Sequence, residues 1–273
     1  MNILNKKKTQ LILIISFLLG LIITINLFIV YLNPIKKTIL EYEEGIWFII
    51  IIISVRMGLL LLMSIYLFKS WFDQENYYFS DIPFLFGIFF MFVFFGKLYD
   101  LLHNLTYHFI DNFSFLIILK IRFLIGILSI TPMYYLSIGM IIFFFSLSEK
   151  YPKFNDKEFS DRIQLIILIL IILIETIIII LFLNVGTNVL ILPGIVIPSF
   201  LIIVLVFFFA YKNQRLSQVN PLILTVGFAA YLISQVIRPI FHGVFGEEVL
   251  YILFSELIDL IIFFIIFIGL IKK

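Results

Sequence analysis

Charge is scarce in this chain, and cysteine is absent. Asp and Glu number 17 and Lys and Arg 19 among 273 residues, so 13% of the chain is charged. An ordinary soluble domain is about 25% charged. The missing cysteine excludes disulfides and thiolate metal sites. So little charge, with a net value of only +2, excludes a water-soluble enzyme, a disordered chain and a nucleic-acid-binding domain.

Apolar residues take the place of the missing charge. They make up 63% of the chain, and the mean hydropathy is +1.20. A transmembrane helix needs about 20 apolar residues in a row. The runs predict an all-α, polytopic membrane protein that forms one transmembrane domain over 1–273. We expect eight spans, at 9–32, 46–68, 83–108, 122–147, 164–183, 188–211, 221–245 and 249–271.

Basic residues are distributed unevenly between the loops. With the N-terminus inside, twelve of them lie on the cytoplasmic side and four outside, the four being Lys36, Lys37, Lys120 and Arg122. This asymmetry predicts a cell-membrane protein with both termini in the cytoplasm. The longest cytoplasmic loop, about 148–161, is too short to fold alone. We therefore expect any catalytic output to come from another protein.

Several ionisable residues fall inside the predicted spans. Left unpaired, seven charges would cost roughly 20 kcal/mol at about 3 kcal/mol each, so we expect them to pair or to face water. Counted at 1.5 Å per residue, none lies clearly in the inner half of the membrane. This predicts a polar cavity that opens outward and is closed toward the cytoplasm. The seven charged residues are Arg56, Lys97, Asp100, Glu175, Arg238, Glu256 and Asp259, and His103 joins them.

Helical spacing sorts these residues into faces. Tyr231, Gln235, Arg238 and His242 form one stripe, and Lys97, Asp100, His103, Asn104 and Tyr107 form another. We predict that Arg238 pairs with Glu256, with Lys97 and Asp259 as a second candidate pair. Glu175 is expected to pair with Arg56 or Arg238, and a proton site is its alternative. Tyr107, Gln235 and His242 complete the candidate ligand-binding residues.

Metal and haem sites are alternative interpretations of the same residues. Asp100 and His103 have the spacing of two ligands on one helix face, and Glu256 with Asp259 would complete a site. Lys97, one turn away, disfavours a bound cation. His103 and His242 are weaker candidates as haem ligands. No cofactor is assigned. A purely structural role, in which polar contacts of about 0.6 kcal/mol hold helices together, also stays open.

The run FLFGIFFMFVFF at 84–95 indicates a lipid-facing or packing surface. The stretch that follows it, Tyr99 to Tyr107, reads YDLLHNLTY. It resembles the DLLHTLxYKGM signature of MASE3-type membrane-associated sensor domains, which are N-terminal modules of bacterial and archaeal histidine kinases and diguanylate cyclases. The matching residues are Asp100, His103, Thr106 and Tyr107.

That family carries a basic residue at the next helix, and Arg122 in Ile121-Arg122-Phe123 is similar to it. The resemblance covers about 25 residues. The chain departs from the signature at Asn104, in the missing Lys-Gly-Met and in having no output domain. The resemblance implies a sensor whose ligand pocket lies near Asp100 and His103.

Together these patterns favour a receptor-like sensory module. We expect it to bind a small polar ligand or protons in the outward-facing cavity and to signal to a cytoplasmic protein. Its partners would be the lipid bilayer, the small molecule and that signalling protein, with no nucleic acid. A secondary transporter, with or without coupling to protons, is one alternative. An intramembrane enzyme that acts on lipids or uses a metal, and a structural membrane subunit, are the others.

Overall fold

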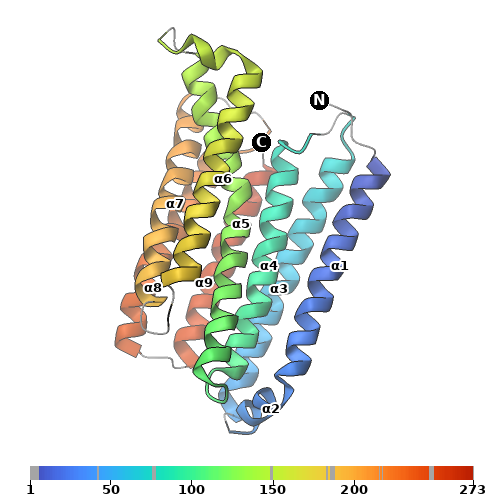
Figure 1. Cartoon of the computed structure of the whole chain (residues 1–273), viewed down its shortest axis with the longest axis vertical. Helices are drawn as coiled ribbons and strands as arrows, with labels where there is room; N and C mark the ends of the chain where they lie inside the picture. The colour runs from blue at the N-terminus through green and yellow to red at the C-terminus, as the bar shows by residue number, and fades with distance from the viewer. Residues whose placement is uncertain are drawn as a thin grey trace. The chain divides into compact units, whose positions relative to one another are not determined.

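The chain is all-α in the part that the computed structural model describes, as the sequence predicts (Figure 1). That part comprises residues 6–41, 43–75, 78–147, 150–182, 184, 188–214, 216, 218–245 and 249–272. The helices are α1 (Lys6–Val30), α2 (Leu32–Glu41), α3 (Glu43–Phe72), α4 (Ile82–Thr106), α5 (Asn112–Ser146), the short 3₁₀ helix η1 (Pro152–Asn155), α6 (Lys157–Phe182), α7 (Asn188–Lys212), α8 (Pro221–Phe245) and α9 (Val249–Ile271).

Seven helices are long and apolar enough to cross a membrane within the described residues, namely α1, α3, α4, α5, α6, α8 and α9. In α7 the apolar stretch is shorter, at Ile197–Lys212. This confirms a multi-pass, membrane-like protein. The count of eight spans and the orientation of the termini stay predictions.

Two features of the helices differ from the prediction. Helix α2 was not expected, and its Thr38 hydroxyl donates to the Leu105 carbonyl of α4 at 2.8 Å. Helix α5 begins ten residues earlier than predicted, because Asp111 caps it: one carboxylate oxygen accepts from the backbone N–H groups of Phe113 and Ser114, each at 3.0 Å. Arg122, which the sequence placed in an outer loop, is therefore well inside the helix.

Contacts divide the chain into two compact units, which we call the N-terminal unit (Met1–Ser129) and the C-terminal unit (Ile130–Lys273). The boundary falls within α5, so that helix contributes its first half to one unit and its second half to the other. The prediction of a single domain over 1–273 stays a prediction. Each unit is described by itself below.

Helix α4 is the core helix of the N-terminal unit. Its Phe-rich run packs inside the protein instead of facing lipid, since Phe86, Phe89 and Phe90 are at most 1% exposed. Two close contacts surround it. The Ser64 hydroxyl of α3 donates to the carbonyl of Gly87 at 2.8 Å, and the ring of Phe95 fills the space beside a glycine of α1. These contacts hold α4 in place, and the C-terminal end of the same helix carries the polar residues described below.

In the C-terminal unit, α8 packs against both α7 and α9. The rings of Phe207 and Phe228 stack between α7 and α8, with centroids 5.6 Å apart. Between α8 and α9 the backbones approach closely at Gly227, where a Cβ would lie 2.6 Å from a side-chain carbon of Ile266. Glycine is required there because a larger residue would collide with the neighbouring helix.

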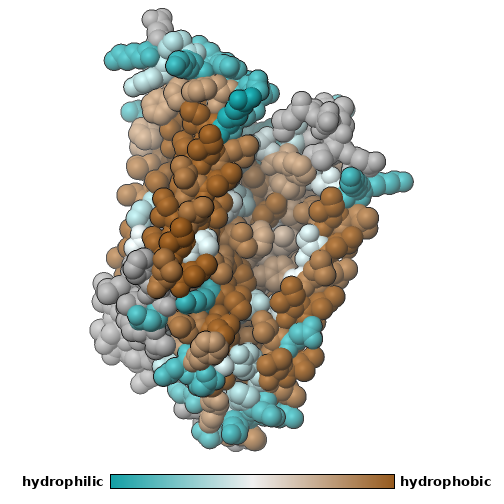
Figure 2. Space-filling model, viewed as in Figure 1, coloured by the Kyte–Doolittle hydropathy of each residue, from teal (hydrophilic) through white to brown (hydrophobic). Residues whose placement is uncertain are grey.

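Apolar side chains cover the outer faces of several helices, as expected of surfaces that contact lipid. Figure 2 shows this brown surface along α6 and α1, with hydrophilic residues gathered around η1. The exposed apolar residues of α6 include Leu165, Ile166, Ile169, Leu170, Leu173, Ile174, Ile177 and Ile180. This surface supports the membrane assignment independently of helix length.

Candidate functional site

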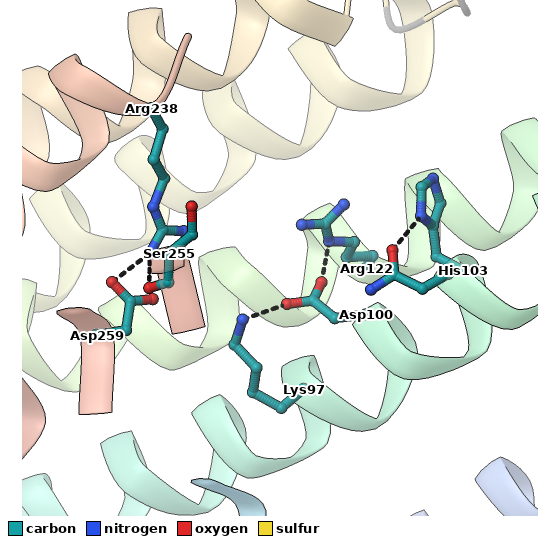
Figure 3. A network of polar contacts seen from close by, with 8 residues as sticks. Lys97, Asp100, His103, Arg122, Arg238, Ser255 and Asp259 are labelled. Atoms are coloured by element: carbon teal, nitrogen blue, oxygen red, sulfur yellow. Dashed lines mark hydrogen bonds and ion pairs between the residues drawn. The ribbon is translucent and has the colours of Figure 1, made fainter. Parts of the chain in front are cut away.

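Asp100 is the centre of an ionic cluster in the N-terminal unit (Figure 3). One of its carboxylate oxygens lies 2.7 Å from Nζ of Lys97, one turn earlier on α4. The other pairs with Nε of Arg122, which reaches it from α5. The Lys97 and Asp100 side chains are 9% and 14% exposed, whereas Arg122 is 34% exposed. Arg122 is therefore the member of the cluster that a ligand could reach most easily.

Arg56 of α3 adds a third cation to the surroundings of Asp100. Its side chain is only 1% exposed, and it interacts electrostatically with the Asp100 carboxylate. Three helices thus bring positive charge toward one carboxylate. This joins three of the predicted ligand-binding residues, Arg56, Lys97 and Asp100, in a single unit.

His103 lies one turn beyond Asp100 and belongs to an aromatic group. Its ring centroid is 5.1 Å from that of Phe115 in α5 and 5.8 Å from that of Tyr107. Its Nδ1 is 3.4 Å from the Asn104 side-chain oxygen, which is a long hydrogen bond. The Tyr107 side chain is exposed. The site therefore combines a reachable guanidinium with a half-exposed aromatic wall.

Arg122 is the residue of this site that reasoning from spans and loops missed. It was counted as an outer-loop charge, because the predicted span began at that residue. Two signals could have placed it correctly. One is the helix-capping pattern at Asp111, and the other is the basic residue of the MASE3-type resemblance.

In the C-terminal unit Arg238 pairs with Asp259, and its guanidinium lies 3.4 Å from the backbone carbonyl of Ser255 (Figure 3). The sequence predicted Glu256 as the partner of Arg238. The structure shows an ion pair with Asp259, three residues farther along α9, and the pairing with Glu256 stays a prediction. Glu256 is buried at 6% exposure and contributes to the electrostatics around Arg238. The pairing of Lys97 with Asp259 would join the two units and stays a prediction.

Glu175 has hydroxyl partners instead of the arginine that the sequence predicted. The Tyr134 hydroxyl of α5 donates to Oε1 of Glu175 at 2.5 Å. The same hydroxyl is hydrogen-bonded to that of Ser199 in α7. Oε2 of Glu175 is buried and has no hydrogen bond within the described residues. Ser199 is not among the site residues that the sequence predicted.

The polar stripe of α8 is described only in part. The ring of Tyr231 contacts those of Phe200 and Phe263, at centroid distances of 4.7 and 5.4 Å. The amide nitrogen of Gln235 is buried without a hydrogen bond in the described part of the chain. The side chain of His242 lies outside the described residues, so its role stays a prediction.

No group of three or more His, Cys, Asp or Glu that could hold a metal occurs among the described residues. The cations beside Asp100 also oppose a metal there. A hollow of about 260 Å³ lies between α1, α2 and α4. Its lining is apolar apart from Thr24, so it is not the polar, outward-facing cavity that the sequence predicts. That cavity stays a prediction.

Comparison with known proteins found no matching family model, no matching curated protein and no matching solved structure.

Proposed function

We propose that the protein is a receptor-like sensory module of the cell membrane, in which the Lys97–Asp100–Arg122 cluster binds a small anionic or polar molecule. The observation that carries the proposal is the ion pair between Asp100 on α4 and the partly exposed Arg122 on α5. A guanidinium binds carboxylates and phosphates with two parallel hydrogen bonds. A ligand anion can therefore compete with Asp100 for Arg122.

The consequence of that competition is a change in how α4 and α5 are held together. Without ligand, Arg122 ties α5 to α4 through Asp100, while Lys97 supports Asp100 from its own helix. A bound anion replaces Asp100 on Arg122 and leaves Asp100 with Lys97. The ligand shifts the balance between the two states only by its difference in affinity for them.

The aromatic group of His103, Tyr107 and Phe115 supports the same proposal. It lies on the helical turns next to the ionic cluster and includes the exposed Tyr107 ring. Such a wall, beside a small number of charged groups, is the usual composition of a small-molecule site. The resemblance to MASE3-type sensor domains points to the same residues.

The orientation proposed from the basic residues is compatible with the revised position of Arg122. Lys120 and Arg122 both lie within α5, and Lys36 and Lys37 lie within α2. Setting aside Arg122, which is paired with Asp100, leaves three basic residues on the outer side against twelve on the cytoplasmic side, so the direction of the asymmetry is unchanged. We therefore keep eight spans, cytoplasmic termini and a cytoplasmic signalling partner as parts of the proposal.

The test is a thermal-unfolding assay of the purified protein in nanodiscs with inorganic phosphate, acetate or succinate, and with choline as a cationic comparison. We expect at least one anion to raise the midpoint. A ligand at 100 times its Kd stabilises by about 2.7 kcal/mol. R122Q should lose this stabilisation, because the substitution removes the exposed guanidinium and leaves only the Asp100 and Lys97 side chains of the cluster.

The matched control is R162Q. Arg162 pairs with Glu158 on the exposed surface of α6, with side chains 72% and 75% exposed, so its loss should leave the anion effect unchanged. Stabilisation that persists in R122Q, or that choline produces equally, would refute the proposed site. Absence of any anion effect in the wild-type protein would refute the anionic ligand class.

A further inference from the structure

The carboxyl of Glu175 lies within the apolar body of the C-terminal unit, away from any role in the proposed ligand site. It interrupts an Ile-rich stretch of α6, and the residue is 8% exposed. It lies seven residues before the end of α6, about 10 Å along the helix axis. A carboxyl at such a depth is costly when charged, which calls for a specific compensating arrangement.

The arrangement around Glu175 is built by hydroxyl groups from two other helices. Tyr134 of α5 donates to Oε1, and Ser199 of α7 is hydrogen-bonded to Tyr134. Tyr134 and Ser199 are themselves buried, at 3% and 4% exposure. Hydroxyls can act as donor or acceptor by rotation. Three helices therefore meet at a chain of groups that can rearrange around one carboxyl.

The electrostatics of this cluster favour a neutral carboxyl. The titratable group that faces Glu175 from α5 is Tyr134, which is uncharged, and α7 faces it with the Ser199 hydroxyl. Arg238 of α8 is paired with Asp259, and Arg162 of α6 is paired with Glu158 on the exposed surface. A buried carboxylate without a cation is expensive, whereas a protonated carboxyl is an ordinary hydrogen-bonding group.

We propose that Glu175 is a proton-binding site, with Tyr134 and Ser199 as the hydroxyl groups that accommodate its two charge states. The proton is bound on Oε2, the oxygen that accepts no hydrogen bond from the described residues. When the proton leaves to water, the carboxylate remains, and the rotated hydroxyls donate to it. No other bond is made or broken.

A proline lies close to each of the two hydroxyl residues, so binding or release of the proton can be accompanied by a local change in the helices that carry them. Pro132 precedes Tyr134 by two residues inside α5, and Pro198 directly precedes Ser199 inside α7. Each proline lacks the N–H that would complete a helical hydrogen bond. The two hydroxyls are thus carried on helix turns that can adjust locally when the charge of Glu175 changes.

This proposal does not rest on the sensory function proposed above. It uses no residue of the Lys97–Asp100–Arg122 cluster, and its failure would leave the anion assay unaffected. Conversely, loss of the anion effect would not change the state of Glu175.

Two measurements test the proton site on purified protein in nanodiscs. Infrared spectra recorded as the pH is raised should show the C=O band of a protonated carboxyl at neutral pH, and its loss when the proton leaves. The second measurement is labelling by dicyclohexylcarbodiimide, which reacts with protonated carboxyls in apolar surroundings. We expect E175Q to abolish both signals.

The matched control is E158Q, on the same helix. Glu158 is exposed and paired with Arg162, so both signals should persist in that variant. A wild-type protein without the band at neutral pH, or E175Q with the band intact, would overturn the proposal. Labelling that Na⁺ suppresses at constant pH would also overturn it, because the occupant would then be an alkali cation.

Y134F separates a proton site from a carboxyl that merely packs. The substitution removes the hydroxyl group that donates a hydrogen bond to the ionised carboxylate. The aromatic ring, which packs inside the protein, is kept. We expect the midpoint of labelling to move to higher pH while the folded protein is retained. An unchanged midpoint in Y134F would show that the hydroxyl does not serve the ionised state and would overturn its assigned role.

Discussion

Asp111 is exposed, yet its carboxylate fixes where α5 begins. The hydrogen bond with Ser114, together with the backbone N–H groups that the carboxylate accepts, holds the pKa of Asp111 below its ordinary value. A group with a lowered pKa in the folded state stabilises the fold fully above its unfolded pKa of about 3.9. That contribution is lost as the pH falls through the lower, folded-state pKa.

We therefore expect D111A to lower the thermal midpoint at neutral pH, and the difference from wild type to shrink on acidification below about pH 4. D111N should keep the cap at every pH, because its amide oxygen accepts the same hydrogen bonds without titrating. Thermal unfolding between neutral and acidic pH checks this. A difference between wild type and D111A that is independent of pH would contradict the capping role of the charge.

The partner of Arg238 shows how far single residues can be assigned from sequence. Reasoning from depth placed the arginine correctly among buried acidic residues of α9. It chose Glu256, whereas the structure shows an ion pair with Asp259. The two acidic residues lie three residues apart on one side of the helix, so depth alone does not distinguish them. The choice depends on how α8 and α9 are rotated toward each other, and packing at Gly227 sets that rotation.

Helices α8 and α9 were predicted with the bounds that the structure has, at 221–245 and 249–271. Long apolar runs between polar turns define such helices well. The start of α5 was wrong because its first turns carry Lys120 and Arg122, which interrupt the apolar run. A charge that is paired inside the protein looks, in the sequence, like a charge in a loop.

The close packing of α8 against α9 leads to a prediction for a substitution at Gly227. A Cβ at Gly227 would lie 2.6 Å from Cγ1 of Ile266 and 3.3 Å from the same residue's backbone nitrogen. We expect G227A to cost about 1–3 kcal/mol, as overpacking does, because α9 must move away from α8. Thermal unfolding measures the cost.

The control for this substitution is G58A in α3. A Cβ at Gly58 meets nothing within 4 Å, so the same change should leave the midpoint unaltered or slightly higher. Equal effects of the two substitutions would indicate a general response of these helices to alanine instead of a close contact at Gly227.

At the scale of the whole molecule, the sequence predicts a multi-pass helical protein and the structure confirms it, because apolar run length is a direct physical requirement of the bilayer. The side of the membrane on which each loop lies is a weaker inference, since it rests on charge counts alone. The polar network was expected to be one pocket; its residues belong to both compact units, so that expectation stays a prediction.

The absence of cysteine makes topology directly measurable, because any introduced cysteine is unique. We expect N155C and N213C to react with a membrane-impermeant maleimide only from the cytoplasmic side, and N184C only from outside. N184C and N213C flank α7. Reaction of both from the same side would mean that α7 does not cross, and would reduce the eight proposed spans to seven.

Helix α5 runs through both units as one continuous element of 35 residues. Arg122 and Tyr134 are twelve residues apart on it, about 18 Å along the axis. Pro132 lies between them, and because a proline removes one backbone hydrogen bond, it is the position at which this helix can bend. Bending at that proline would let the guanidinium and the phenol move separately, although one helix carries both.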